Sequence, residues 1–379
     1  MLDAIRGLIS WTPLGLPAFL FVITVVVFFH ELGHFLVARA FGVKVDVFSV
    51  GFGKEIVGRT DRLGTRWRLS YLPIGGYVKF AGDADAASRP DAQAAARASS
   101  AEREGMLMFK PLYQRALVAA AGPLANFVLA IVMLTAILSY TGHVMVAPLV
   151  GEVAKGSPAA AAGIQTGDLI TRIDQTPIND FQQLPEIISV SNGTTPLAIG
   201  IKRAGHDITI WVTPRVAKVH DILGNPTSQI AIGVMSNAKA TQTRLHYSPV
   251  GAFAAATTET WSIMRVTVLT IARMIGGHGG ADQLSGPVGI AKMTHQVAEV
   301  GFLPLLNLVA ILSVSIGLAN LFPIPLLDGG HLLYYGCEAV LGRPLGERAQ
   351  DVGFRLGLVL VLGLMLLTTW NDLVRLNLF

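Results

Sequence analysis

The chain has 379 residues, of which 52% are hydrophobic and only 14% are charged. Soluble domains carry about 25% charged residues, so this composition favours a membrane protein. The net charge of +4 comes without a run of lysines or arginines, which excludes an obvious nucleic-acid-binding surface. Cys337 is the only cysteine, so histidines and carboxylates would have to bind any metal.

Several apolar stretches are long enough to span a hydrocarbon core, which requires roughly 20 helical residues. The first runs into a polar motif without a cleavage site, so we interpret it as a retained helix and not as a signal peptide. We expect a multi-pass α-helical membrane protein with about four transmembrane helices, at residues 16–38, 117–140, 303–324 and 353–370.

The end of the first span carries ionisable side chains, which are costly at membrane depth and usually functional. The stretch "FFHELGHFL", residues 28–36, contains the pattern H-E-x-x-H. On a helix, His30 and His34 share one face and can bind a single zinc ion. Glu31 can take a proton from zinc-bound water. A pair of packed, hydrogen-bonded histidines is the alternative interpretation.

Segment 39–116 carries 13 lysines and arginines against 8 acidic residues. By the positive-inside rule, this segment and 325–352 lie in the cytoplasm. Residues 141–302 and both chain ends then lie on the outer side, which is the periplasmic side in a bacterium.

Within the cytoplasmic segment, "TRWRLSYLPIGGYVKFAG", residues 65–82, predicts a β-hairpin around the turn residues 73–76. An exposed edge of such a sheet can bind an extended peptide as an added strand. We assign this pairing edge to Tyr77, Val78, Lys79 and Phe80. An ordinary cytoplasmic hairpin is the alternative.

After the second span the sequence changes character, because charges and turn residues return. The stretch "GSPAAAAGIQTGDLI", residues 156–170, resembles the bacterial PDZ domain, and we place one PDZ-like α+β domain at 146–215. Its groove is expected between the strand 149–153 and the helix 180–191. Such a groove binds extended peptides or C-termini. Alternatively, the domain only excludes bulky substrates.

Residues 216–302 are predicted to be a linker with one amphipathic helix at 250–275 lying along the membrane interface. Because this helix is not counted as a span, 303–324 runs in the same direction as the first span. That direction brings Asp328 to the depth of His30.

The third metal ligand is expected after the third span, in "GLANLFPIPLLDGGHLL", residues 317–333. Zinc is bound by carboxylate oxygens as well as by imidazole nitrogens. Asp328 follows a helix that is broken by two prolines. A simple turn at Asp328-Gly329-Gly330 is the alternative interpretation.

Together, "HELGH" and "NLFPIPLLDGG" resemble the paired motifs of the site-2 protease family, and the chain is most similar to the bacterial regulator-of-sigma-E protease type. "FSVGFGKE", "AGPLANFVLA" and "LSGPVGIA" resemble family segments in the same order. The resemblance divides the membrane core into residues 1–140 and 303–379, and it implies that the hairpin 65–82 re-enters the membrane and holds the extended substrate. It implies a zinc-dependent endopeptidase of the bacterial inner membrane that cleaves transmembrane segments of single-pass proteins in regulated intramembrane proteolysis.

By the same resemblance, His30, His34 and Asp328 bind one Zn²⁺, Glu31 is the general base, and Asn320 donates to the substrate backbone or oxyanion. Anti-sigma factors in stress responses and leftover signal peptides are the implied substrates. Two other functions compete with this one. A non-catalytic PDZ scaffold would be expected to have lost Glu31 or a ligand, and a metal transporter would be expected to show an inverted repeat, which the sequence lacks.

Overall fold

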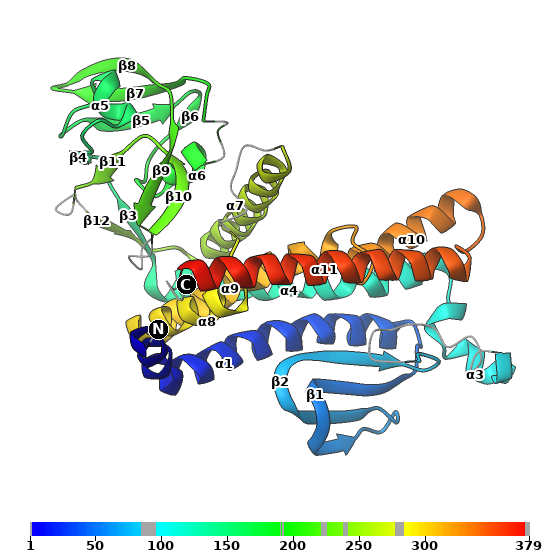
Figure 1. Ribbon diagram of the computed structural model, residues 1–379. Coiled ribbons are helices and arrows are strands. Elements are labelled where there is room, and N and C mark those ends of the chain that lie inside the picture. Colours follow the sequence, from blue (N-terminus) through cyan, green and yellow to red (C-terminus); the bar gives the residue numbers. More distant parts are fainter. Residues whose placement is uncertain are drawn as a thin grey trace. The chain divides into compact units, whose positions relative to one another are not determined.

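The computed structural model describes residues 2–84, 96–189, 191, 193–220, 226–237, 242–276 and 284–375. The chain divides into two compact units (Figure 1). Unit 1 combines Met1–Leu134 with Ser285–Phe379, and unit 2 is Thr135–Leu284. Unit 1 therefore joins the two ends of the chain around an inserted unit.

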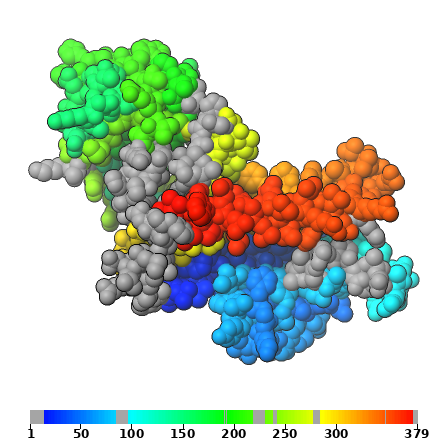
Figure 2. Space-filling model, in the orientation of Figure 1, coloured from blue at the N-terminus to red at the C-terminus, as the bar shows by residue number. Residues whose placement is uncertain are grey.

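Four helices among the described residues are long and apolar enough to cross a membrane. Three of them are longer than the predicted spans, but all four coincide with them, which confirms this part of the expected fold class. They are α1 (Leu2–Ala40), α4 (Leu112–Thr141), α9 (Phe302–Leu321) and α11 (Glu347–Arg375). Helix α11 lies on the surface of unit 1 (Figure 2), and its exposed side chains include Leu356, Val359 and Leu366.

Small residues let the helices of unit 1 approach closely, as is usual in membrane bundles. A Cβ atom at Gly33 of α1 would collide with the backbone of Ala121 on α4, and Gly317 of α9 packs against Asn126 of α4. Val22 of α1 shares a buried cluster with Val309 of α9. Helices α1 and α9 therefore run in the same direction and α4 runs in the opposite one, so the C-terminal ends of α1 and α9 lie together (Figure 1).

The predicted hairpin is present but begins earlier, because residues before Thr65 supply its first strand. Strand β1 (Val45–Thr60) pairs antiparallel with β2 (Arg66–Phe80). Both strands bend, and residues 47–50 pair with 66–69 on one side and with 76–79 on the other. The sheet thus has four rows, and the row Gly76–Phe80 forms one outer edge.

Aromatic side chains fix this sheet against α1. Phe35 of α1 contacts Phe48 and Trp67 edge-on, with ring centroids 5.5 and 4.9 Å away, and Phe48 stacks on Trp67. The bend of β1 requires glycine at position 51, where φ is +89° and a Cβ would meet the carbonyl oxygen of Leu72 at 2.7 Å. This packing holds the edge row beside the helix that carries the H-E-x-x-H motif.

The remaining helices of unit 1 are α3 (Ser100–Glu104), the 3₁₀ turn η1 (Leu107–Phe109), α8 (Pro287–Val300) and α10 (Asp328–Leu341). Helix α8 corrects the sequence interpretation, which treated 216–302 as a linker with a single helix. Asp372 accepts hydrogen bonds from the backbone N–H groups of Gly286 and Gly289 at 3.1 and 2.7 Å. The helix start is completed by a residue more than 80 positions away, so no local capping signal marks it.

Unit 2 is built on a four-stranded sheet of order β6-β5-β7-β8, with three further strand pairs, β4-β11, β9-β10 and β3-β12. Its core contains Ile170, Ile199 and Leu184. The elements are β3 (His143–Val146), β4 (Val150–Val153), α5 (Pro158–Ala162), β5 (Leu169–Ile173), β6 (Thr176–Pro177), α6 (Gln183–Ser189), β7 (Leu197–Arg203), β8 (His206–Val212), β9 (Arg215–His220), β10 (Pro226–Ala231), β11 (Val234–Ser236), β12 (Gln242–Leu245) and α7 (Pro249–Ile275).

Two expectations for this unit were wrong. Strands continue beyond residue 215, to Leu245, where the sequence suggested a linker. The strand 149–153 also has a covered edge where an open one was expected. Val150 and Val153 pair with β11 on one side, while Leu149 bridges Leu169 on the other and the N–H of Val150 donates to the carbonyl oxygen of Asp168. The start of this strand therefore cannot pair with an added peptide.

Candidate metal centre

The three predicted ligands converge at the junction of α1 and α10. His30 Nε2 lies 3.1 Å from one carboxylate oxygen of Asp328, and His34 Nε2 lies 3.4 Å from the other. The two Nε2 atoms are 3.3 Å apart. One ligand atom from each residue lies within 4.8 Å of the others, and among the described residues no other group of this kind occurs.

Asp328 reaches the histidines because the chain turns tightly between α9 and α10. Gly329 and Gly330 leave no room for a Cβ atom, since the carbonyl oxygens of Phe322 and Ile324 pack against them. Leu326 takes φ of +108°, a conformation that costs about 1–3 kcal/mol in a non-glycine residue. The "PIPLLDGG" segment is therefore a packed, strained turn and not a flexible loop.

The chemistry of these residues fits a catalytic zinc ion. Two imidazoles and one carboxylate form a set of three ligands that leaves a fourth position for water. His34 Nδ1 lies 2.8 Å from the carbonyl oxygen of Val118, which accepts its N–H and directs Nε2 toward the centre. Asp328 Oδ2 is buried and faces His30 Nε2 at 3.1 Å, the arrangement expected of two ligand atoms that share one cation.

Glu31 lies beside the predicted ligands and lines the same cavity as Val78 of the edge row. A Cβ atom at Gly76, in the same row, would lie 3.5 Å from Cγ of Glu31. The proposed base therefore lies against the edge row of the hairpin. Sequence alone predicted both groups but not that they lie together.

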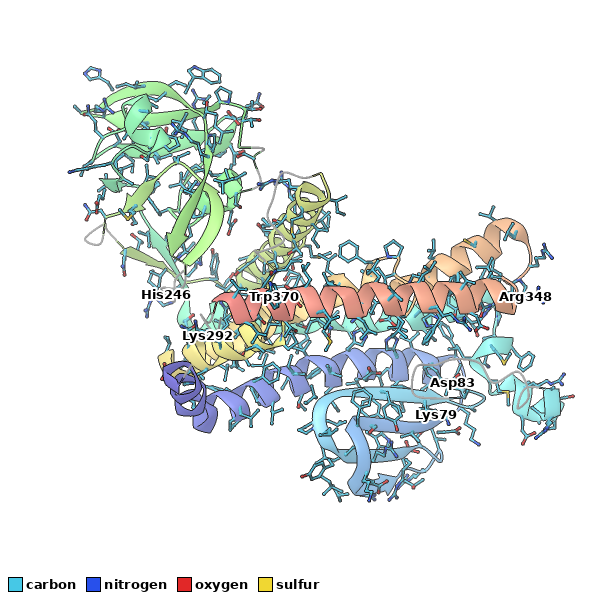
Figure 3. All side chains as sticks on the ribbon, viewed as in Figure 1. Lys79, Asp83, His246, Lys292, Arg348 and Trp370 are labelled. Atoms are coloured by element: carbon cyan, nitrogen blue, oxygen red, sulfur yellow. The ribbon has the colours of Figure 1, made fainter. Side chains whose placement is uncertain are left out.

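The ligands and Glu31 line one cavity of about 230 Å³. Of the predicted substrate-binding residues, Asn320, Tyr77, Val78 and Phe80 line it and Lys79 does not. Lys79 lies near Asp83 where β2 ends (Figure 3). The other lining residues are Gly76, Leu107, Arg115, Val118, Ala119, Leu326, Leu327, His331 and Tyr335.

Sequence reasoning missed the ion pair at the rim of this cavity. Arg115 of α4 donates two hydrogen bonds to the carboxylate of Glu338 on α10, and its guanidinium lies 5.1 Å from the ring centroid of Tyr335. The pair ties α10, which begins at Asp328, to α4. An arginine near a span and a glutamate far along the chain form no motif, so only their charge in an apolar setting could have drawn attention.

Asn126 of α4 was not among the site residues predicted from the sequence. In the structure its side-chain nitrogen lies 3.3 Å from His30 Nδ1, so the residue also contacts a predicted ligand. The small-residue run "GPLAN" was the available signal, but it does not show which side chain Asn126 faces.

Comparisons with known proteins agree on one family. The sequence profile of Peptidase family M50 matches residues 18–364. A predicted zinc metalloprotease of Mesorhizobium japonicum is 44% identical over 360 residues, covering 94% of this chain and 98% of the relative. One from Agrobacterium fabrum is 42% identical over 356 residues, covering 94% of each. Metalloprotease MmpA of Caulobacter vibrioides is 40% identical over 388 residues, covering 96% of each.

The family match extends from the first span to the last, and the relatives align along nearly their whole lengths. The two motifs recognised in the sequence lie inside this match, one at each end of it. The chain therefore belongs to Peptidase family M50, the site-2 protease family, and is a membrane zinc metalloprotease.

Proposed function

We propose that the protein is an intramembrane endopeptidase that hydrolyses peptide bonds within transmembrane segments of single-pass membrane proteins. One observation carries the proposal: the three ligand residues, Glu31 and an open sheet edge line the same cavity, and two of the ligands lie inside a helix of membrane-spanning composition. A metal centre among helices of this composition is expected in a protease that acts within the membrane.

Each residue has a distinct role in this proposal. His30, His34 and Asp328 hold the ion, which polarises the scissile carbonyl and lowers the pKa of water when bound. Glu31 accepts the proton of the attacking water on its carboxylate and passes it to the leaving amine. Asn320, on the cavity wall, donates a hydrogen bond to the carbonyl oxygen as negative charge develops there.

The edge row Gly76–Phe80 binds the unwound substrate. A transmembrane helix must give up its internal hydrogen bonds before cleavage, and in lipid the freed groups need new partners. Val78 lines the cavity that also holds Glu31 and the proposed ligands, so a substrate strand added to this edge would lie next to the ion.

A re-entrant position of the hairpin in the membrane is supported by its contacts and composition. Thr24, near the middle of the first span, donates a hydrogen bond to the carbonyl oxygen of Pro73 at 3.3 Å. Exposed apolar side chains gather at the same end of the hairpin, among them Phe52, Ile56, Tyr71, Leu72 and Ile74. A cytoplasmic hairpin would expose this surface to water at a considerable cost.

The proposed setting is the inner membrane of a bacterium, with unit 2 and both chain ends on the periplasmic side. Unit 2 acts there as a PDZ-like domain that binds a peptide or admits only trimmed substrates. Helix α7 lies along the membrane interface, which fits its exposed Phe253, Trp261, Val268 and Ile275, spaced seven or eight residues apart. Anti-sigma factors and leftover signal peptides are the proposed substrates.

The test compares Glu31→Gln with the parent in membranes, using a tagged single-pass substrate whose outer domain has been removed. We expect cleavage to fall by at least about 10²-fold, because general base catalysis is lost, while zinc content stays at one ion per chain. The control is Glu299→Gln, which changes an exposed carboxylate on α8. This variant should cleave the substrate at the parent's rate. Undiminished cleavage by Glu31→Gln would contradict the mechanism. Metal flux into vesicles would favour a transporter.

A further inference from the structure

Asn126 is the most deeply buried polar side chain beside the metal centre. It lies on α4, is 0% exposed, and places its side-chain nitrogen 3.3 Å from Nδ1 of His30. Its side-chain oxygen is buried without a hydrogen-bond partner among the described residues. An orphaned amide oxygen at this depth costs about 1–3 kcal/mol and calls for a physical explanation.

The chemistry of His30 supplies the explanation. A neutral imidazole carries one hydrogen, so a histidine that binds a metal through Nε2 carries that hydrogen on Nδ1 and needs an acceptor there. For His34 the acceptor is the carbonyl oxygen of Val118. For His30 the group at Nδ1 is the side chain of Asn126.

The amide of Asn126 can supply that acceptor. A half-turn about its Cβ–Cγ bond exchanges the nitrogen and the oxygen without changing the shape of the side chain. After this exchange the oxygen accepts the Nδ1–H of His30, and the nitrogen takes the position that the oxygen has left. The amide can therefore satisfy either tautomer of His30, whereas a backbone carbonyl such as that of Val118 satisfies only one.

The position of Asn126 is restricted by contacts with α9. Ser313 of α9 donates a hydrogen bond to the backbone carbonyl of Asn126 at 2.9 Å. Gly317, one turn further along α9, leaves space for the Asn126 side chain, since a Cβ atom there would lie 3.0 Å from that of Asn126. These contacts limit how far Asn126 can move away from His30.

We propose that Asn126 is a positioning residue, whose side-chain oxygen accepts the Nδ1–H of zinc-bound His30 and thereby sets the tautomer and orientation of that ligand. The inference rests on the proposed role of His30 as a ligand. It assigns a chemical role to the asparagine of the "GPLAN" segment, which was not predicted from the sequence.

The experiment measures zinc affinity by competition with a chelator in detergent-purified full-length protein, independently of proteolysis. Removing a partner of a metal-bound histidine typically weakens metal binding by about 10–100-fold. We expect that loss for Asn126→Leu, which keeps the size but has no acceptor. Asn126→Asp, which offers a carboxylate acceptor, should bind zinc at least as tightly as the parent.

The matched control is Ser315→Ala on the same helix α9, which removes a hydrogen bond to the carbonyl oxygen of Ile311 and should leave zinc affinity within about twofold. Thermal melting of each metal-free variant shows whether it is folded. If Asn126→Leu binds zinc like the parent, or if Asn126→Asp binds as weakly as Asn126→Leu, the proposal is wrong.

A second measurement does not depend on the Asp variant folding. In the cobalt-substituted parent, the Nδ1–H protons of the two ligating histidines should give two shifted proton resonances that exchange slowly with solvent. Asn126→Leu should lose or broaden one of them and keep the other, which Val118 protects. Loss of both, or of neither, would contradict the assignment. Parent protein that binds no metal at all would refute the proposed centre itself.

Discussion

At the scale of single residues, glycines decide how closely the helices surround the metal centre. A Cβ atom at Gly122 of α4 would overlap the imidazole of His34, and one at Gly329 would overlap the backbone at the end of α9. Protein interiors are packed too densely to absorb an added methyl group without displacement. Because these glycines lack a side chain, the proposed ligands His34 and Asp328 can occupy their observed positions.

The substitution Gly122→Ala tests whether the small size of this glycine keeps His34 in its position. The added methyl group should displace His34 and lower zinc affinity by at least about 10-fold, since overpacking costs typically 1–3 kcal/mol. Cleavage of a membrane substrate should fall with it. Zinc competition and substrate cleavage are measured on the same purified protein.

The control is Gly363→Ala on α11, where a Cβ atom meets nothing within 4 Å. Alanine favours a helix over glycine by about 1 kcal/mol, so this variant should keep full zinc binding and melt no lower than the parent. Equal zinc affinity in Gly122→Ala and Gly363→Ala would show that His34 has more room than its contacts indicate.

At the scale of elements, a polar latch joins the end of α1 to the turn of the hairpin. Arg39 donates hydrogen bonds to Asp61 at 2.6 Å and to Thr65 at 2.7 Å. Desolvation opposes ionisation of Asp61, but hydrogen bonds from Trp67, Arg39 and the backbone outweigh it and lower its pKa to about 2. The latch is therefore charged at any physiological pH, and it holds the sheet beside the helix that carries the ligands.

A second ion pair stabilises unit 2. Asp168 is buried, and Arg203 donates to both of its oxygens at 2.7 Å. Burial alone would raise the pKa of Asp168, but the hydrogen bonds from Arg203 and the backbone N–H of Gln165 lower it below its ordinary value. The unfolded chain then binds a proton at higher pH than the folded one does.

This shift predicts how the stability of unit 2 depends on pH. A lowered pKa contributes stability that is present above about pH 4, the unfolded value, and is lost as pH falls through the folded pKa. Arg203→Met should remove that contribution and cost about 2–4 kcal/mol at neutral pH, because a buried carboxylate is left unpaired. Thermal unfolding of the full-length protein between pH 3 and 7 checks it.

The control for this comparison is Arg172→Met, an exposed arginine on the same sheet. It should shift the melting temperature little, because exposed interactions contribute about 1 kcal/mol or less. Parallel pH profiles for the parent and Arg203→Met would show that Asp168 is not the group responsible.

At the scale of the whole molecule, the directions of the helices have a consequence for topology. Helices α1 and α9 run the same way and α4 runs in the opposite direction, so the proposed ligands from both ends of the chain lie at one depth (Figure 1). The basic segment 39–116 follows the end of α1 that carries the site. The positive-inside rule therefore predicts a centre near the cytoplasmic side.

Cysteine labelling tests this orientation. Cys337 is the only cysteine, so Cys337→Ser gives a background for single-cysteine variants at exposed positions. We expect Asp207→Cys in unit 2 to react with a membrane-impermeant maleimide in intact bacterial cells. Ala101→Cys, on α3, should react only after the inner membrane is permeabilised. The reverse pattern would invert the proposed topology.

Several features of this protein can be predicted from local patterns in its sequence. The spans are visible because hydrocarbon must be matched by uninterrupted apolar length. His30, Glu31 and His34 are visible because a helix brings positions four apart to one face. Asp328 can be recognised because its "LDGG" turn follows a helix that is broken by two prolines. These features depend on neighbours along the chain, so no fold was needed to find them.

Other features depend on contacts between distant segments and could not be read in this way. The start of α8 depends on Asp372, and the strand 149–153 pairs with β11 along an edge that was expected to be open. Asn126 became a partner of His30 only when α4 packed against α1. The sequence by itself determined which side chains could bind zinc and that they lie among membrane helices. The tertiary structure decided which groups orient those ligands, because orientation is set by packing between segments that share no local pattern.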